Sequence, residues 1–482
     1  MNHVGRLRSL GRNLKTDTRL WLCAALAATT CVGLVPTASA ATDPVTGSQQ
    51  LVYGGDYSDC FWHVGAIGVE SYNIAYPDAG AHYWGAMYKP IPGMTLRIKG
   101  TFPYARYSSI NSYDRLGSIL DTISDFQWNP DAGSSNPFRP GVKRDVAKRS
   151  YTLTLASDWV GVPTADRRAN LPARNTIHTA PLLGDTVQGV AIRVYVPNNG
   201  KDIRGGVPLP TAELTLANGT ILTGQAACDA LHSEDPELLD PSALLLSANQ
   251  YNALRYQKKS NGSPKYASYF PALKGGKANW RTQYTRQYLL NLYHPEADPL
   301  QGAVKSGQSG FFPNGDNQYV RNAINRKLGQ VYAMRGTLPT TAVTRNNPSG
   351  TWQNSNLRYL SFCMNESPRT TRVMDCVYDE EIPLRTGRKY LVVTSRAADR
   401  PSNATAACGV AWIEWSPRGD GDLDHDFGWM QIRNMLPAAD FTHAIQNTKV
   451  PGDEKSTLGS YLPTSKYYKN KAAFQKLGCP AK

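Results

Sequence analysis

A diverged internal repeat constrains the fold of this 482-residue chain more than any other feature. Both copies contain an apolar strand ending in G-T-x-P, an Arg-Tyr pair, a Tyr-Asp pair and a strand with a basic residue before a tyrosine, in that order. These landmarks lie at 100–103, 106–107, 113–114 and 148–155 in the first copy, and at 336–339, 358–359, 378–379 and 388–394 in the second. The recurrence predicts one module built twice.

The clearest similarity between the copies lies in two apolar strands, at 189–197 and 409–417, which both begin with Gly-Val-Ala. Each is followed by a loop and then by a Leu-Pro pair, at 209–210 and at 436–437. Because the landmarks recur in the same order, we expect these two strands to occupy the same place in the two modules.

Short apolar or alternating runs separated by turn residues predict antiparallel β-structure rather than a parallel α/β sheet. The 26 Tyr and 10 Trp agree with this, since aromatic residues favour strands. Residues 241–256 and 280–293 have helical spacing instead. We therefore predict a mostly β protein. It would have two tandem β-sandwich or jelly-roll modules, at 41–225 and 311–482, and a helical and loop bridge at 226–310.

The first forty residues predict export. Five basic residues accompany an apolar stretch at 20–35, and Ala38, Ser39 and Ala40 supply the small-residue cleavage pattern. No later stretch approaches the roughly twenty apolar residues that a membrane helix needs. We expect a signal peptide at 1–40, no transmembrane segment after its cleavage, and a secreted, periplasmic or cell-envelope protein.

Six cysteines remain after residue 40: Cys60, Cys228, Cys363, Cys376, Cys408 and Cys479. An even number of cysteines in an exported protein favours disulfides. Only one pairing follows from the sequence, Cys363 with Cys376, because these two flank a polar segment that looks like a hairpin loop.

The chain carries 52 Lys and Arg against 38 Asp and Glu, and removal of 1–40 takes away five basic residues and one acid. The remaining net charge of +10 favours an anionic partner: an anionic polysaccharide, a cell-wall polymer or a small-molecule ligand. No dense basic tract with interleaved aromatic residues occurs, so nucleic acid is not expected.

The pattern R-Y-x-S followed by Y-D, then Y-T-L-T-L, G-V-A-I-R-V-Y and a closing Leu-Pro resembles the bacterial jelly-roll family of unknown function numbered twelve-fourteen. Residues 76–84 and 136–138 look like those of exported relatives that carry the module twice. The resemblance covers most of 72–215 and 311–480. It implies the fold and supplies no function.

The repeated Arg-Tyr pairs are candidate ligand-binding residues: Arg106, Tyr107, Arg358 and Tyr359. The planar fork of an arginine binds carboxylate, sulfate or phosphate. The alternative is structural, with the arginine stacked on an aromatic ring or holding a loop carboxylate such as Asp114 or Asp379.

An acidic tract offers candidate metal ligands at Asp420, Asp422 and Asp424, since alternating oxygen ligands suit Ca²⁺. The positions where an EF-hand has Gly and Glu hold His425 and Gln431. His425, oriented by Asp424, is also a candidate catalytic base. The alternative is a solvated acidic hairpin loop.

A third cluster near the mature N-terminus contains His63, His82, Asp59 and Asp78 beside Trp62, Tyr83 and Trp84. Here His82 is a candidate catalytic residue, and Trp84 a candidate wall of a ligand cleft. The alternative is the half-buried lip of a sandwich.

Three functional hypotheses follow. The first is an exported protein that binds an anionic envelope or extracellular ligand. The second is a secreted hydrolase or lyase acting on a carbohydrate or ester, with a His, Asp and Arg site between the modules. In that case His82, His178 and residues 424–426 matter most, because they have no counterpart in the other copy. The third is an envelope protein without a small ligand.

Overall fold

The computed structural model describes residues 59–114, 117–159, 161, 167–182, 187–231, 245–255, 278–283, 312–422 and 424–481. From Ala40 onward the chain forms one compact unit. The described part is mostly β, as the sequence predicts, and contains no helix long and apolar enough to cross a membrane. The expected signal peptide lies outside the described residues.

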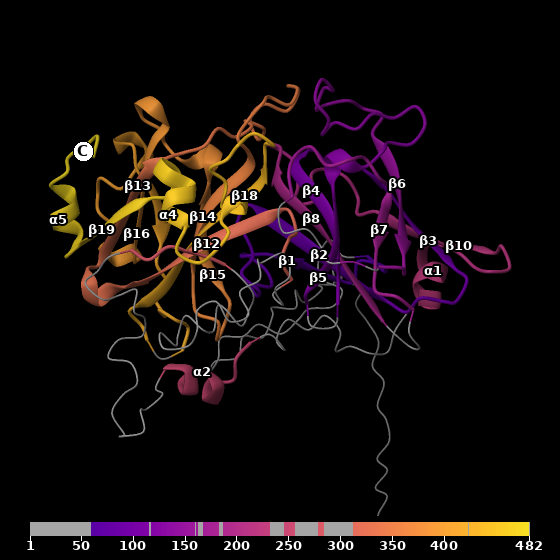
Figure 1. Cartoon of the computed structure of the whole chain (residues 1–482), viewed down its shortest axis with the longest axis horizontal. Helices are drawn as coiled ribbons and strands as arrows, with labels where there is room; N and C mark the ends of the chain where they lie inside the picture. The colour runs from indigo at the N-terminus through magenta and orange to yellow at the C-terminus, as the bar shows by residue number, and fades with distance from the viewer. Residues whose placement is uncertain are drawn as a thin grey trace, which may run out of the picture. The chain divides into compact units, whose positions relative to one another are not determined.

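The first module contains two five-stranded sheets, which we name its inner and outer sheets (Figure 1). The inner sheet has the order β1 (Val64–Ile67), β2 (Ala81–Tyr88), β8 (Gln188–Pro197), β4 (Ala105–Tyr113) and β5 (Ile119–Ser124). The outer sheet has the order β10 (Ile221–Thr223), β9 (Thr211–Thr215), β3 (Thr95–Thr101), β6 (Ser150–Ala156) and β7 (Thr176–His178).

The second module repeats this arrangement. Its inner sheet has the order β11 (Arg281–Thr282), β12 (Asn317–Asn325), β18 (Phe427–Pro437), β14 (Leu357–Asn365) and β15 (Val373–Tyr378). Its outer sheet has the order β17 (Ala411–Glu414), β16 (Lys389–Ser395), β13 (Val331–Thr337) and β19 (Thr464–Tyr468). The two outer sheets match strand for strand except that β10 has no counterpart among the described residues.

The expected match of the two Gly-Val-Ala strands is wrong. Residues 188–197 form the central inner strand β8, whereas residues 411–414 form β17, which runs parallel to β16 at the edge of the outer sheet. The counterpart of β17 is β7, which runs parallel to β6. The counterpart of β8 is β18, and its Leu436-Pro437 end matches Val196-Pro197. In both cases the residue before the proline has positive φ, 46° at Val196 and 40° at Leu436.

Apolar residues on alternate positions of facing strands form the core of each sandwich. On β6, for example, Tyr151, Leu153 and Leu155 are buried while their neighbours are partly exposed, which is the period-two pattern of a strand with one solvated face. The central inner strands differ, because every residue of β4, β12 and β18 is buried. One face of each of these strands packs on the outer sheet of the same module. The other face carries polar residues toward the inner sheet of the other module.

Helices are few and short. The described ones are α1 (Gly224–Leu231), α2 (Ala248–Arg255), α4 (Glu454–Leu458), α5 (Lys471–Gln475) and the 3-10 turns η1 (Asp125–Gln127), η5 (Arg326–Leu328), η6 (Asp379–Glu381), η7 (Thr386–Arg388), η8 (Ala397–Asp399), η9 (Ala406–Cys408), η10 (Ile445–Asn447) and η11 (Gly459–Tyr461). Helix α2 lies in the expected helical segment 241–256. The start of the other expected helix is wrong, because residues 281–282 pair with β12 as strand β11; residues 284–293 lie outside the described residues.

Three disulfides connect the six cysteines: Cys60–Cys228, Cys363–Cys376 and Cys408–Cys479. The expected Cys363–Cys376 pairing is confirmed, and it joins directly opposed residues of β14 and β15. Each disulfide stays within one module, so the contacts between the modules are non-covalent.

Candidate functional site: a cavity between the inner sheets

Strand alternation on the inner sheets sends one set of side chains to a core and the other set to a shared cavity. On β8, Val190, Ile192 and Val194 belong to the core of the first module, whereas Ala191, Arg193 and Tyr195 line the cavity. Strand β18 does the same in the second module, with Ile432 in the core and both Gln431 and Arg433 at the cavity. The cavity therefore follows from the period-two geometry of two equivalent strands.

The cavity encloses about 890 Å³ of empty space, including its opening. Its walls come from both modules and consist of apolar, aromatic, amide and arginine side chains. The lining residues include Tyr76, Tyr83, Trp84, Tyr113, Arg193, Tyr195, Gln283, Phe312, Asn314, Tyr319, Arg321, Gln431 and Arg433. No aspartate, glutamate, lysine or histidine occurs among the described residues that line it.

Three arginines occur among the described residues that line the cavity, and of these only Arg433 has a carboxylate partner within the described chain. Its Nη1 lies 3.1 Å from Oδ2 of Asp78, and its Nη2 donates to the carbonyl oxygens of Tyr76 at 2.7 Å and Pro77 at 3.1 Å. This arginine is therefore a structural link between the second module and the turn before β2.

Arg193 and Arg321 have no carboxylate partner within the described part of the chain. Arg193 is 4% exposed and donates through Nη2 to the carbonyl oxygen of Phe312 at 2.7 Å, but its Nε and Nη1 have no hydrogen-bond partner there. Arg321 is 3% exposed, and its Nε and Nη1 are likewise without a partner. Because an arginine keeps its proton in proteins, both are buried cations with unused donors.

Aromatic rings hold these guanidinium groups in place. Arg193 lies 5.4 Å from the ring centre of Tyr83 and 5.6 Å from that of Tyr113, and Arg321 lies 4.1 Å from that of Tyr76. Burial raises the pKa of Tyr83 and of Tyr113 to about 12, so both hydroxyls stay protonated at neutral pH. The Tyr113 hydroxyl donates to the carbonyl oxygen of Pro313, so among these residues the donors that the cavity offers are those of the arginines, beside flat aromatic walls.

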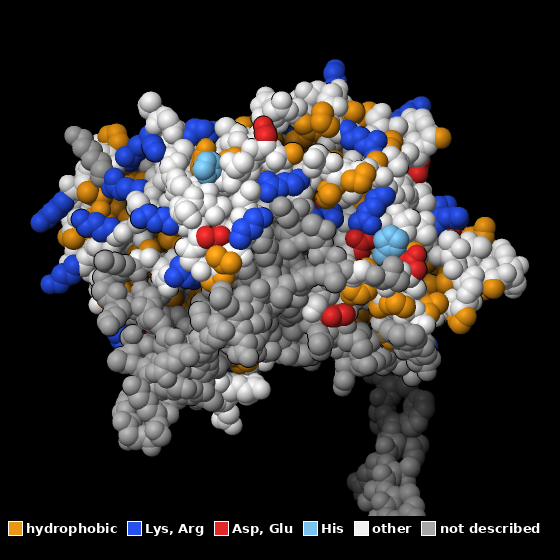
Figure 2. Space-filling model, in the orientation of Figure 1, with side chains coloured by type: hydrophobic (Ala, Val, Ile, Leu, Met, Phe, Trp, Pro, Cys, Tyr) orange, Lys and Arg blue, Asp and Glu red, His pale blue; other side chains and the backbone are white. Residues whose placement is uncertain are grey.

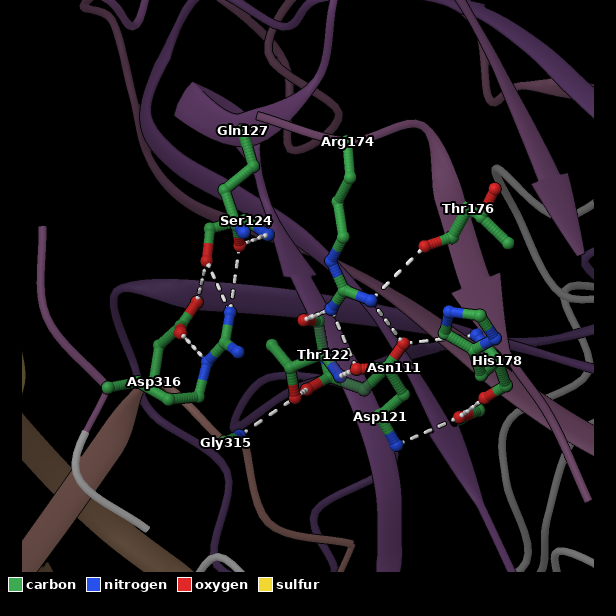
Figure 3. Close-up of polar contacts among 12 residues, drawn as sticks. Asn111, Asp121, Thr122, Ser124, Gln127, Arg174, Thr176, His178, Gly315 and Asp316 are labelled. Atoms are coloured by element: carbon green, nitrogen blue, oxygen red, sulfur yellow. Dashed lines mark hydrogen bonds and ion pairs between the residues drawn. The ribbon is translucent and has the colours of Figure 1, made fainter. Parts of the chain in front are cut away.

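Polar residues around the cavity hold the modules together, and Figure 3 shows part of this network. The carboxylate of Asp316, from the turn before β12, accepts hydrogen bonds from Tyr107 and Ser124 of the first module and pairs with Arg167 at 2.6 Å. In the opposite direction, Asp78 of the first module accepts hydrogen bonds from Tyr359 at 2.7 Å and from the Ser361 hydroxyl at 2.6 Å.

The repeated Arg-Tyr pairs belong to this structural network. Arg106 is fully buried: Nη1 and Nη2 bind the carboxylates of Asp379 and Glu380, and Nε donates to Thr344. This arrangement is the structural alternative considered for the Arg-Tyr pairs, in which the arginine binds a loop carboxylate, here that of Asp379. Since every nitrogen that can donate is used and none is exposed, the structure leaves Arg106 nothing to offer a ligand. Tyr107 and Tyr359 are buried with their hydroxyls engaged, as described above.

Arg358 and Trp84 have different surroundings. Arg358 lies 3.4 Å from the carboxylate of Asp125 and 4.1 Å from the ring centre of Trp352, at the wall of an open hollow separate from the cavity. Trp84 is fully buried, and its ring belongs both to the core of the first module and to the cavity wall. Trp84 is thus one of the expected ligand-binding residues that the structure places at the cavity.

The carboxylates of the acidic tract stabilise their own loop. Oδ1 of Asp420 accepts the backbone N–H groups of Asp422 and Asp424, and its Oδ2 accepts the hydroxyl of Tyr251. Asp424 accepts from Asn325 and from the N–H of residue 426. Among the described residues, these three carboxylates do not converge as a metal cluster. The one group of three ligand atoms that does is Asp78, Cys363 and Cys376, and its cysteines form a disulfide. Asp420 and Asp424 thus accept hydrogen bonds from their own loop, and the calcium hypothesis stays a prediction.

The expected catalytic residues do not come together in the described structure. His82 is half-buried on β2, and burial lowers its pKa. His425 is exposed on the acidic loop of the other module, and Asp424, beside it in the sequence, accepts hydrogen bonds from Asn325 and the loop backbone instead. His178 contacts Asp158 at 2.7 Å near the edge of the outer sheet, and its backbone N–H donates to Asp121 (Figure 3).

The three arginines among the described cavity residues, Arg193, Arg321 and Arg433, were not among the sequence candidates. A signal was available for two of them. Arg193 lies between two apolar residues in the strand segment Ala-Ile-Arg-Val-Tyr, and Arg433 follows Ile432 in the strand segment Met-Gln-Ile-Arg-Asn-Met. A cation in a strand that is buried on both faces needs a partner or a ligand.

Comparisons with known proteins identify no family for this chain. No family model matches the chain, and no curated protein matches it. Among solved structures, an uncharacterized protein from Burkholderia cenocepacia is 12% identical over 87% of this chain and 84% of that chain, with a TM-score of 0.43. A protein from Vibrio parahaemolyticus is 10% identical over 82% of this chain and 91% of that chain, with a TM-score of 0.36. The resemblance to the jelly-roll family numbered twelve-fourteen stays a prediction.

Proposed function

We propose that this protein is exported and binds an anionic small molecule in the cavity between its inner sheets. Export is supported by the signal-peptide pattern at 1–40 and by three disulfides, which form and persist in oxidising compartments. Of the partners expected from the sequence, the cavity favours the small-molecule ligand, since its walls combine apolar and aromatic side chains with a few polar and cationic groups.

One observation carries the proposal: Arg193 and Arg321 are buried cations at a cavity whose described lining contains no acid. A buried charge without a counter-ion costs several kcal/mol, so such groups are normally paired. An anion in the cavity would supply the missing charge and accept from the unused N–H groups. Both arginines are fixed by aromatic contacts before the ligand arrives, which lowers the entropy cost of binding.

The outer surface supports the same location for the ligand. On the face shown in Figure 2, Lys and Arg side chains are spread over both modules and do not form one continuous patch. The excess positive charge of the chain would draw anions toward the protein in general. The buried arginines, by contrast, would select an anion that fits the cavity. The aromatic walls favour a ligand with a flat organic body.

A binding screen on the mature protein, from Ala41 onward, tests the proposal. Organic anions are compared with neutral analogues of the same shape, such as benzoate with benzamide and glucuronate with glucose, by thermal shift and then calorimetry. At least one anion should raise Tm while its neutral analogue does not. Arg321→Gln should weaken that binding roughly tenfold or more, because a charge-assisted hydrogen bond is lost.

The matched control is Arg97→Gln, an exposed arginine of the outer sheet that lies 3.7 Å from Glu213. It removes the same charge far from the cavity and should leave the affinity unchanged. The proposal is wrong if no anion raises Tm, or if the two variants weaken binding equally.

A further inference from the structure

The turns that precede β2 and β12 are equivalent and hold equivalent arginines. Each turn contains an aromatic residue followed by proline, and the aromatic residue has positive φ in both, 57° at Tyr76 and 47° at Phe312. In each case a central-strand arginine donates through Nη2 to the carbonyl oxygen of that aromatic residue at 2.7 Å, Arg433 to Tyr76 and Arg193 to Phe312. The two sites therefore share one backbone framework.

The next position of the turn differs between the modules. In the first module it is Asp78, whose Oδ1 accepts from the Tyr359 hydroxyl and from the N–H of Gly80. Its Oδ2 accepts from Ser361 at 2.6 Å and lies 3.1 Å from Nη1 of Arg433. One carboxylate oxygen thus fixes the turn, and the other neutralises the arginine.

In the second module the same position holds Asn314. Its Oδ1 accepts from the N–H of Asp316 at 3.1 Å and lies 3.1 Å from the Tyr107 hydroxyl, which is also 2.5 Å from Oδ2 of Asp316. Oδ1 of Asn314 thus faces the same two kinds of group as Oδ1 of Asp78 does in the first module. Because a backbone N–H must meet an oxygen, these contacts also fix the orientation of the amide. The amide nitrogen therefore stands where Asp78 has the oxygen that neutralises its arginine.

This substitution leaves donors without an acceptor. Nδ2 of Asn314 and Nε and Nη1 of Arg193 have no hydrogen-bond partner within the described chain. Asn314 is 2% exposed, and both residues line the cavity. The first module thus has a built-in carboxylate at this position, and the second has only groups that would bind one.

We propose that a carboxylate of the ligand occupies the second module's counterpart of the Asp78 site, where one of its oxygens accepts from Arg193 and from Nδ2 of Asn314. This inference rests on the proposed function and specifies its ligand as a carboxylate with a flat body. Tyr83 and Tyr113, which flank Arg193, form the nearest walls for that body.

Asn314→Asp tests the inference directly, because it builds into the second module the carboxylate that the first already has. The new Asp should pair with Arg193, and we expect Tm at pH 7 to rise by about 2–4 °C. The pairing depresses the pKa of the new carboxyl in the folded state. The gain should therefore be present above about pH 4 and disappear below it. Asn199→Asp, the same change at an exposed asparagine, should give no such gain.

Ligand binding provides the second test. Benzoate, benzamide and phenyl phosphate are titrated into the wild type, N314D and Arg321→Gln. A carboxylate should bind the wild type and lose at least tenfold in affinity in N314D, because the internal carboxylate then occupies its place. Arg193→Gln should lose affinity for the carboxylate to the same extent while retaining its fold. That result would support the contact between Arg193 and the carboxylate of the ligand.

Each other outcome has a distinct meaning. If N314D folds, gains no stability over N199D and binds benzoate as the wild type does, the inference is overturned. If N314D fails to fold, Arg193→Gln decides instead, and an unchanged affinity for benzoate in that variant overturns the inference. The proposed function survives that result if Arg321→Gln still weakens binding. If phenyl phosphate binds and no carboxylate does, the ligand class is wrong. If no anion binds the wild type, the inference and the proposed function both fail.

Discussion

Two kinds of buried arginine lie at the boundary between the modules, and their partners distinguish them. Arg106 binds two carboxylates and a threonine from the second module, whereas Arg193 has unused donors at a cavity. Burial alone does not separate a structural arginine from one with unused donors, since both are almost completely buried. The two kinds are distinguished by whether each N–H group of the guanidinium has a hydrogen-bond partner.

Replacement of Arg106 by alanine should strongly destabilise the protein. It would leave the buried carboxylate of Asp379 and the half-buried one of Glu380 without their cation, and the loss of one partner of a buried pair costs about 3–5 kcal/mol. Arg97→Ala, which removes an exposed ion pair, should cost under about 1 kcal/mol. Urea unfolding at pH 7 measures both. Similar losses in the two variants would contradict the structural role of Arg106.

At the residue scale, the sequence carried part of this information. The alternative that Arg106 holds Asp379 was available from the repeat, because both residues belong to conserved landmarks of the two copies. Which arginines lack partners was not predictable. The difference between Arg433 and Arg193 depends on the identity of a single turn residue more than a hundred positions away, Asp78 or Asn314.

At the scale of elements, β-strands were predictable and their places in the sheets were not. Period-two apolar patterns identify strands because each strand has a core face. The same pattern occurs in an edge strand such as β17 and in a central one such as β8, so the shared Gly-Val-Ala start paired strands that are not equivalent. Sheet position is set by hydrogen bonds between distant segments, which local patterns do not record.

The turns η1 and η6 connect the two inner sheets through acidic residues, and this makes stability depend on pH. Asp125 of η1 accepts the N–H of Ser108 and lies beside Arg358 of the other module. Burial raises the pKa of Asp125 to about 7, and the nearby Arg358 only partly opposes this. Asp379 of η6 has its pKa raised by burial as well.

The sign of the effect follows from the raised pKa of Asp125. The folded state holds its proton more tightly than the unfolded state, so this residue stabilises the fold below about pH 4 and loses that contribution as the pH rises toward 7. The loss is at most about 4 kcal/mol. Asp125→Asn should remove this part of the pH dependence, measured by urea unfolding between pH 4 and 8. Asp145→Asn, at an exposed aspartate, should retain it; equal slopes in all three proteins would contradict the assignment.

For the whole molecule, the two modules hold each other through reciprocal contacts. Arg106 of the first binds Asp379 of the second, and Arg358 of the second lies against Asp125 of the first. The tyrosine after each of these arginines donates to an acid of the opposite module. A duplicated chain that folded as two independent sandwiches would leave these faces to water. Here the facing surfaces of the two modules enclose the cavity. Because both modules form its walls, no property of a single module predicts the cavity.

This reciprocity predicts that the halves depend on each other to fold. Because every disulfide lies within one module, a chain divided between 231 and 245 should still assemble when residues 41–231 and 245–482 are co-expressed in an oxidising compartment. The halves should co-purify and unfold in one calorimetric transition, and neither alone should show a cooperative one. Arg106→Ala should weaken their association, since it removes a contact between modules and none within one. Two separate transitions, or a first half that melts cooperatively by itself, would show that the cavity lies between independent domains. Its arginines would then be exposed whenever the domains part, and the energetic case for a buried anion would be lost with the interface.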